Sequence, residues 1–218
     1  MFASASINLI AFVAAVPGLT DGLESALMTP HDQFSSSIGV LGCKLKNTNR
    51  IAYWPRDISC NDLCVEVSHE GRTVHLLQID QSGGAHDISY DAWNYLVSGK
   101  SAKEQPIQGG NVTMQYKFVH MDYCKDLLVD GKLALSAANS MNYVGSCIQD
   151  KTSWVANNYE LVNIADSACH YGWDEKCTLD LTVSNQAKCL HTLGGLDHQP
   201  AGLAVTNIQY GTSIEVNA

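Results

Sequence analysis

Eight cysteines constrain this chain more than any other feature of its sequence. An even number of cysteines behind an apolar N-terminal segment predicts a disulfide framework, because such bridges persist in oxidising compartments. Zinc is the rival interpretation, but Cys60-x-x-x-Cys64 is wider than the paired Cys-x-x-Cys spacing of structural zinc sites. Four of the cysteines lie at or before residue 124 and four lie after it, which favours pairing within two halves. The cysteines are Cys43, Cys60, Cys64, Cys124, Cys147, Cys169, Cys177 and Cys189.

The first residues predict the compartment. Residues 7–16 form an apolar run that is too short to span a bilayer. Val13-Ala14-Ala15 offers the small residues that a signal peptidase prefers. We therefore predict a signal peptide over 1–18 and a secreted, extracellular protein; the alternative is a buried first strand or helix, because no Lys or Arg precedes the run. Residues 19–40, with Pro30 and a run of serines, are expected to form a flexible N-terminal arm.

The charge distribution argues against several classes of function. The formal net charge of -9 is spread along the chain, and Lys and Arg form no stripe. Nucleic acid and anionic membranes are therefore not expected as partners. The eight histidines form no HxH or HExxH pattern, so no metal site is expected. No Gly-x-Ser-x-Gly elbow occurs, which argues against a serine nucleophile. No cofactor is expected.

One stretch has a clear local structure. Residues 73–79 are rich in β-branched and aliphatic side chains, which favours a strand. Gly83-Gly84 then allows the positive φ that a turn needs. Ser89 is a suitable N-cap for a short helix, and Gly99 is a suitable stop. The sequence therefore predicts a strand, a glycine turn and a capped helix.

Two motifs in this region resemble a known family. Ile79-Asp80-Gln81-Ser82, followed by Asp87-Ile88-Ser89-x-x-Ala92-Trp93-x-x-Leu96, resembles the (H)(F)DLSxxAFxxL motif of the double-psi β-barrel in the expansin, barwin and RlpA-like superfamily, with Ser82 in place of the usual cysteine. Residues 112–119 resemble the closing strand of that barrel. The resemblance implies a double-psi β-barrel over 41–125. A Cys43–Cys124 bridge would then join the two ends of the barrel.

The remaining part, 126–218, is expected to be a β-rich, disulfide-stapled C-terminal domain, which makes the whole chain all-β. Apolar residues alternate with polar ones over residues 178–184, and further strands are predicted near Leu133, over 203–210 and near Val216. A β-sandwich or an extension of the barrel fits this pattern. Expansins also carry a β-sandwich after their barrel, but this analogy is one of position only.

The resemblance also implies candidate carboxylates. Catalytic relatives of this barrel act on glycosidic bonds, and inverting hydrolysis needs an acid and a base on either side of the bond. Asp87 matches the motif aspartate that acts as the acid in such endoglucanases, and Asp57 or Asp80 could be the base. In the alternative interpretation Asp87 caps the helix or braces its loop, and Asp57 is a solvated loop residue.

Aromatic residues suggest a contact surface for a sugar or a protein partner. Tyr53 and Trp54 point to opposite faces if they lie on a strand, so only one can be exposed. Trp93 fits the core better, as part of a hydrophobic staple with Ile88. The predicted partner-binding residues are Tyr53, Trp54, Asp57, Asp80, Asp87 and Tyr90.

Asn111-Val112-Thr113 is an N-glycosylation sequon, so a glycan at Asn111 is a further hypothesis. Taken together, the sequence predicts a secreted, non-enzymatic, expansin-like binding protein that resembles fungal effectors and virulence factors. Its expected partner is a cell-wall polysaccharide or a host extracellular protein, such as a defence protease or glycosidase that it inhibits. The alternatives are a glycoside hydrolase or lytic transglycosylase using Asp87, and a structural cell-wall protein.

Overall fold

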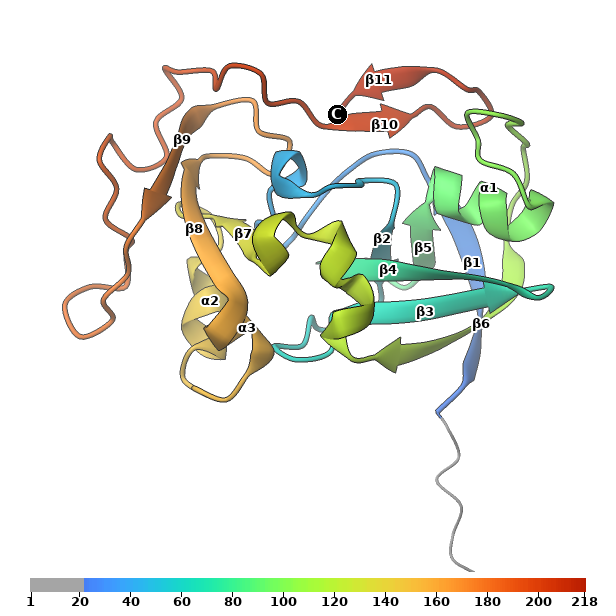
Figure 1. Cartoon of the computed structure of the whole chain (residues 1–218), viewed down its shortest axis with the longest axis horizontal. Coiled ribbons are helices and arrows are strands. Elements are labelled where there is room, and N and C mark those ends of the chain that lie inside the picture. Colours follow the sequence, from blue (N-terminus) through green and yellow to red (C-terminus); the bar gives the residue numbers. More distant parts are fainter. Residues whose placement is uncertain (1–21) are drawn as a thin grey trace, which may run out of the picture.

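A computed structural model describes residues 22–218, and six of its strands close into a barrel (Figure 1). The strand order is β1-β5-β2-β4-β3-β6, and β6 pairs with β1 to close the ring. The mostly β character and the barrel confirm the coarse prediction, whereas the double-psi type stays a prediction. The predicted signal peptide lies outside the described residues. The strands are β1 (Glu24–His31), β2 (Ile51–Trp54), β3 (Cys64–His69), β4 (Arg72–Gln81), β5 (His86–Ser89) and β6 (Val112–Val119).

The segment expected to be a flexible arm contains the first barrel strand. β1 pairs with β5 in parallel and with β6 in antiparallel register. Its side chains alternate, because Met28 is fully buried whereas Leu27 is 57% exposed. Phe34 and Val40, further along the same segment, are also buried. The prediction of a flexible arm is therefore wrong for these residues; Pro30 is tolerated in this strand although it carries no amide hydrogen to donate.

The predicted strand, turn and helix are confirmed. β4 and β5 flank the glycine turn, and the helix α1 (Tyr90–Ser98) follows directly. Gly99 ends α1 with a φ of 78°, a left-handed conformation that suits glycine. The hydroxyl of Ser89 has another role than capping: it accepts the amide of Ile51 at 2.9 Å and so ties the start of α1 to β2.

The C-terminal half contains more helix than the sequence indicated. Its elements are β7 (Leu133–Ser136), α2 (Met141–Cys147), α3 (Trp154–Asn158), β8 (Tyr159–Ile164), β9 (Gly172–Cys177), β10 (Thr206–Ile208) and β11 (Glu215–Asn217). Short 3-10 segments are η1 (Gly42–Lys44), η2 (Met121–Leu127) and η3 (Val129–Gly131). β7, β8 and β9 form a three-stranded sheet, and β10 pairs only with β11. The short helices were missed because neither is long enough to show a 3.6-residue pattern.

The predicted strand over residues 178–184 is wrong. A turn stands there instead, because Asp180 competes with strand pairing through its own side chain. Its carboxylate accepts the amide of Thr182 at 2.9 Å and the hydroxyl of Thr182 at 2.6 Å. The amide of Val183 donates to the carbonyl of Asp180 at 3.0 Å.

All eight cysteines are paired, which confirms the disulfide prediction. The predicted Cys43–Cys124 bridge is wrong, and pairing does not stay within the halves. Cys124 pairs with the barrel strand β3, whereas Cys43 lies in η1, where the amide of Gly42 donates to the carbonyl of Ser167 at 2.9 Å. The four bridges are Cys43–Cys169, Cys60–Cys147, Cys64–Cys124 and Cys177–Cys189.

The chain has two hydrophobic cores that share the barrel wall. One contains inward-facing residues of all six barrel strands together with Trp93 and Leu96 of α1. The other contains outward-facing residues such as Ile51, Leu77 and Ile79, which pack against the C-terminal half. One wall of the barrel is therefore covered, and loops of both halves meet along that seam. Among residues 22–218, no helix is long and apolar enough to cross a membrane.

Candidate functional site

Three of the predicted site residues lie in one row on the outer wall of the barrel. Tyr53 on β2 is opposite Asp80 on β4 and opposite Asp87 on β5. Thr29 on β1 continues the row beside Asp87. Residues at the same register in neighbouring strands share a face, so Tyr53 stands between the two carboxylates. With strands spaced about 4.8 Å apart, the Cα atoms of Asp80 and Asp87 are roughly 10 Å apart.

Asp80 holds the segment that follows β1 onto the barrel. Its carboxylate accepts the amide of Ser37 at 3.0 Å and the amide of Gln81 at 2.8 Å. It also accepts the hydroxyl of Ser35. With three protein donors, this carboxylate acts as a bracket between β4 and residues 35–37.

The other two predicted carboxylates also have protein partners. Asp87 accepts the hydroxyl of Thr29, which links β5 to β1. Asp57 accepts the side-chain amide of Gln81 at 3.1 Å. Asp87 lies within β5 and not at the start of α1, so it braces two strands and does not cap the helix.

The predicted aromatic surface does not form, because its three aromatic side chains are buried. Trp54 and Tyr90 are each 1% exposed, and Tyr53 is 5% exposed. Trp54 points into the barrel, where its ring centroid lies 5.3 Å from that of Tyr116. The hydroxyl of Tyr90 donates to the carbonyl of Ile107 at 2.8 Å. Side chains alternate along β2, so Trp54 faces the core inside the barrel whereas Tyr53 faces the core shared with the C-terminal half.

Tyr53 is fixed in the row as a neutral phenol. Its hydroxyl donates to the carbonyl of Gln33 at 2.9 Å, and the ring of His31 lies 4.4 Å away. Burial raises the pKa of Tyr53 above its ordinary value, and the negative charges of Asp80 and Asp87 raise it further. The side chain therefore fills the space between the two carboxylates and stays protonated.

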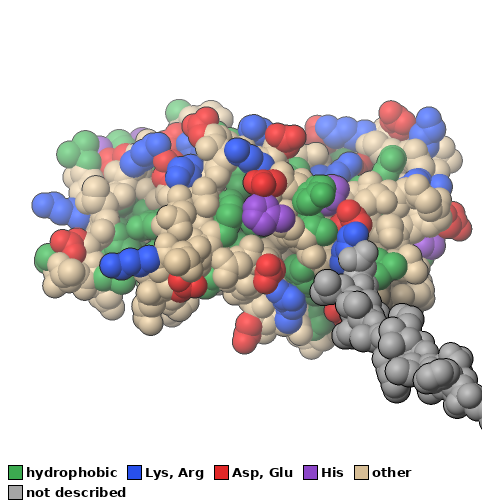
Figure 2. Space-filling model, turned by 60° about the horizontal axis from the view of Figure 1, so that its bottom comes forward, with side chains coloured by type: hydrophobic (Ala, Val, Ile, Leu, Met, Phe, Trp, Pro, Cys, Tyr) green, Lys and Arg blue, Asp and Glu red, His purple; other side chains and the backbone are tan. Residues whose placement is uncertain are grey.

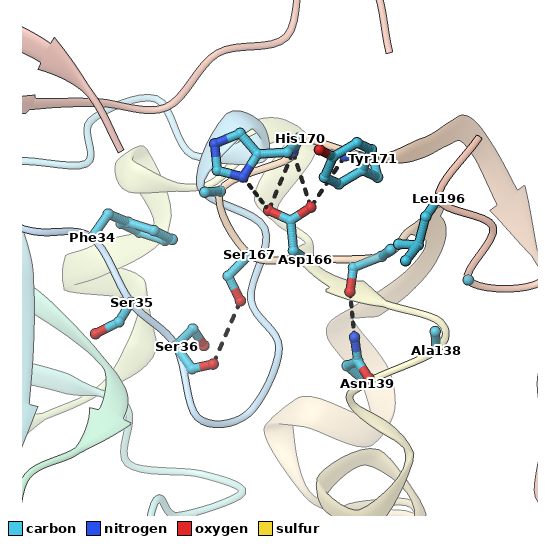
Figure 3. A pocket seen from close by; sticks show the side chains of 13 residues that line it. Phe34, Ser35, Ser36, Ala138, Asn139, Asp166, Ser167, His170, Tyr171 and Leu196 are labelled. Carbon is cyan, nitrogen blue, oxygen red and sulfur yellow. Dashed lines mark hydrogen bonds and ion pairs between the residues drawn. The ribbon is translucent and has the colours of Figure 1, made fainter. Parts of the chain in front are cut away.

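An open pocket lies where the two halves meet, beside the end of this row (Figure 3). We call it the seam pocket. Its volume is about 690 Å³, and it is lined by residues of the segments 34–36, 138–139, 165–171 and 194–196. Ser35 belongs both to this lining and to the hydrogen bonds of Asp80. The volume lies within the usual range for a small-molecule site.

Asp166 organises one wall of the seam pocket. Its carboxylate accepts the amide of His170 at 3.0 Å and the amide of Tyr171 at 3.1 Å, and it pairs with the imidazole Nδ1 of His170 at 3.1 Å (Figure 3). The Nε2 atom of His170 lies 2.9 Å from the carbonyl oxygen of Ala218. Both ring nitrogens are thus engaged, which leaves neither group as a free acid or base.

The polar groups that remain open to a ligand are uncharged. Within residues 22–218, no protein group bonds to the hydroxyl of Tyr171 or to the side-chain oxygen of Asn139, whose amide donates to the carbonyl of Ala165. The hydroxyl of Ser167 makes only a long contact of 3.5 Å to the carbonyl of Ser36. Tyr171 is 39% exposed, and Phe34, which also lines the pocket, is buried. The site can therefore offer neutral hydrogen bonds and a ring face.

None of the residues that line this pocket was predicted from the sequence. They come from four segments that are far apart in the chain, and no motif links them. The only local signal is Asp166, a residue type that is common in turns; the amide of Cys169 donates to its carbonyl at 3.0 Å. Among the described residues, no group of three or more His, Cys, Asp or Glu side chains could hold a metal ion.

These features define a disulfide-stapled β-barrel protein with a polar pocket, in which the charged lining side chains Asp166 and His170 are paired with each other. No family model matches the chain, and no curated protein matches its sequence. Among solved structures, the chain is similar to cerato-platanin 2 from M. perniciosa, with 17% identity and a TM-score of 0.33 over 46% of this chain and 98% of that chain. For cerato-platanin 3 from M. perniciosa the values are 11% and 0.32, over 46% and 98%. A likeness of this size carries no argument about function.

Proposed function

We propose that this chain is an extracellular, non-catalytic protein that binds a neutral cell-wall polysaccharide in the seam pocket. The extracellular compartment is supported by its four disulfides, since such bridges are typical of oxidising environments. The ligand class is supported by one observation above all: every open polar group of the pocket is uncharged. Neutral hydroxyl groups of a sugar can form hydrogen bonds with such partners, and the ring of Tyr171 offers an apolar face.

The distribution of charge on the surface does not favour a charged ligand. Positive and negative side chains are interspersed on the face drawn in Figure 2, and no region of one sign dominates it. An exposed charge contributes weakly to affinity in salt. We therefore expect binding that changes little between low and moderate ionic strength.

Hydrolysis by Asp87 is the weaker proposal. The backbone positions of Asp80 and Asp87 would suit an acid and base pair. However, Tyr53 lies on the strand between them, and its ring occupies the space between the two side chains. A glycosidic bond and an attacking water need that space. In addition, Asp80 is occupied by three protein donors. The row is better explained as a bracket that fixes the wall of the barrel.

A host extracellular protein is the second candidate partner, and one feature favours it. The Cys177–Cys189 bridge closes a loop in which Val183 is 81% exposed, and Leu190, just beyond the bridge, is 86% exposed. Exposed aliphatic side chains on a rigid loop are typical of a protein contact. Their replacement by serine would abolish binding to such a protein and would leave polysaccharide binding intact.

Sedimentation with insoluble cellulose, β-glucan and chitin tests the first proposal. The wild type is expected to sediment with at least one of them, and Tyr171→Ala is expected to bind about fivefold more weakly or worse, since aromatic anchors are typically worth about 1 kcal/mol or more. Tyr123→Ala is the matched control, because Tyr123 is also exposed, at 61%, but lies outside the pocket lining. Equal binding by wild type and Tyr171→Ala, or none by either, contradicts the proposal.

A further inference from the structure

Trp173 on β9 lies between two histidines of the loop that follows. The ring centroids of Trp173 and His191 are 3.8 Å apart, and those of Trp173 and His198 are 3.6 Å apart. Both imidazoles are tilted by only 6° from the indole plane. The indole therefore has a flat imidazole ring against each face. The contacts among Trp54, Tyr116 and Phe118 in the barrel are edge contacts instead.

One of the two histidines is also held by a carboxylate. Glu175, two residues after Trp173 on β9, lies 2.7 Å from the Nδ1 atom of His191 and accepts the amide of His191 at 2.8 Å. Partial burial pushes the pKa of Glu175 upward, but the amide and imidazole of His191 and the side chain of Asn163 outweigh it and lower that pKa to about 2. Glu175 is thus ionised over the whole range in which histidine titrates.

The loop between the two histidines forms a wall of the seam pocket. Gly194 and Leu196 line the pocket. The amide of Gly194 donates to the side-chain oxygen of Asn163 at 3.1 Å, and the carbonyl of His198 accepts the amide of Gly172 at 2.8 Å. The rings of His191 and His198, at the two ends of residues 191–198, stack on Trp173, and Asn163 holds the middle of the loop. The clamp and Asn163 therefore position this wall together.

We propose that Trp173, His191 and His198 act as positioning residues for the seam pocket, and that protonation of the two histidines tightens the pocket wall. An imidazolium on an indole face gains a cation–π attraction that a neutral imidazole lacks. The charge on His191 gains a second partner in Glu175. Both effects exist only while the loop is clamped, so they favour the clamped loop when the histidines are charged.

The direction with pH follows from this difference. The extra stability of the clamped loop is present at acidic pH, where both imidazoles are charged, and is lost as the pH rises and they release their protons. The charged group in contact with the clamp is Glu175 from β9, and the neutral side chain of Asn163 from β8 donates to it. Asp197 is next to His198 in the chain, but its Oδ1 atom lies beside Gly195. The remaining charged side chains of β9, Asp174 and Lys176, pair elsewhere with Lys44 and Glu160.

The effect on affinity rests on the proposed function, because it needs a ligand that contacts the wall. A cation–π contact of ordinary size corresponds to a factor of about two to five for each histidine. We therefore expect cellohexaose or the chitin hexasaccharide to bind about two- to fivefold more tightly per histidine at pH 5 than at pH 8.

The loop itself is tested without ligand. Nuclear magnetic resonance relaxation of the amides of Gly194 and Leu196 is measured between pH 5 and pH 8, together with the imidazole signals. The wild type is expected to show an ordered wall at low pH and exchange broadening at high pH. In the double variant His191→Phe, His198→Phe, the flat rings stay but the charge is gone, and the pH dependence should vanish. His75→Phe is the matched control, since His75 also stacks on an aromatic ring, Tyr123, and pairs with a carboxylate, Glu66.

Each outcome decides one of the two proposals. A wall that is equally ordered across this range in the wild type, or a pH dependence that persists in the double variant, overturns the clamp. A pH-dependent wall in a protein that binds neither hexasaccharide supports the clamp and overturns the polysaccharide ligand. Binding of a hexasaccharide with the same affinity at both ends of the range supports the ligand and overturns the role of the clamp.

Discussion

The barrel and the C-terminal half of this chain differ in how their polar side chains are used: those of the barrel wall are bonded within the protein, whereas several in the C-terminal half are open. On the barrel wall, Asp80 and Asp87 are bound to donors on neighbouring segments, and Tyr53 fills the space between them. In the C-terminal half, loops present Tyr171 and Asn139 with unused hydrogen-bonding capacity. Strands fix side chains by register, whereas loops can offer them to a ligand. The carboxylates that resemble catalytic residues are therefore structural, and the open groups lie on loops.

The largest expected effect separates a bridge that crosses this boundary from a bridge that does not. Cys43–Cys169 links residues 126 apart in the sequence, whereas Cys177–Cys189 links residues 12 apart. In the chain-entropy description, the longer loop is worth about 2 kcal/mol more. We expect Cys43→Ser, Cys169→Ser to lower the free energy of unfolding by about that much more than Cys177→Ser, Cys189→Ser, as measured by denaturant unfolding. Equal losses would show that the two halves are not held together by the crossing bridge.

The next effect concerns Asp91, a buried carboxylate of α1. It accepts Arg50 at 2.9 Å, and Ser101 and the amide of Ala102 at 2.7 Å each. Burial pushes the pKa of Asp91 upward, but Arg50, Ser101 and Ala102 outweigh it and lower that pKa below its ordinary value. This stabilisation is present above the unfolded pKa and is lost as the pH falls through the folded pKa.

We expect Asp91→Asn to destabilise the protein by about 3 kcal/mol at pH 7, because Arg50 loses its partner. The loss should shrink as the pH falls below the unfolded pKa of Asp91, about 3.9, and through its lower folded pKa. Thermal unfolding of both proteins from pH 3 to pH 7 measures this difference. A constant difference over that range would contradict the assigned charge.

A smaller effect is expected at Asp87 on the barrel wall. Asp87→Asn keeps an oxygen that can accept the hydroxyl of Thr29, so the free energy of unfolding should fall by about 1 kcal/mol or less. Wild type and variant should both release no reducing sugar from cellulose, β-glucan, chitin or peptidoglycan. Turnover in the wild type that disappears in Asp87→Asn at unchanged stability would favour the hydrolase.

The smallest expected effect is at Asn111, which is exposed just before β6. If its sequon is used during secretion, peptide-N-glycosidase will reduce the mass of the secreted protein by one glycan. Asn111→Gln should remove that shift and change stability by less than about 0.5 kcal/mol, since the side chain is on the surface. A mass that the enzyme leaves unchanged would show that the sequon is not used.

The sequence predicted the parts that depend on local patterns. The strand before Gly83-Gly84, the helix ending at Gly99 and the full pairing of the cysteines were all confirmed. β1 was missed because Pro30 and polar neighbours hide a short alternating strand whose partners lie far along the chain. The order of partners in a closed barrel is a long-range property, and so is the choice of partner for each cysteine.

The candidate site was predictable only in part. The motif indicated Asp80 and Asp87, which the strand register brings beside Tyr53. The burial of Tyr53 and the hydrogen bonds of the two carboxylates favour a role in supporting the fold. The seam pocket was invisible in the sequence, because it is made from four segments that meet only after the two halves pack. The stack of Trp173 with two histidines is likewise indicated by no spacing rule.

The most direct measurement of the central claim is a map of amide chemical shifts during titration with cellohexaose and with the chitin hexasaccharide. The proposal predicts saturable shifts that cluster at Asn139, Ser167 and Tyr171, with little change at Asp80 or Asp87. Shifts that cluster along the barrel row instead, or no saturable shifts with either oligosaccharide, would contradict a polysaccharide site in the seam pocket.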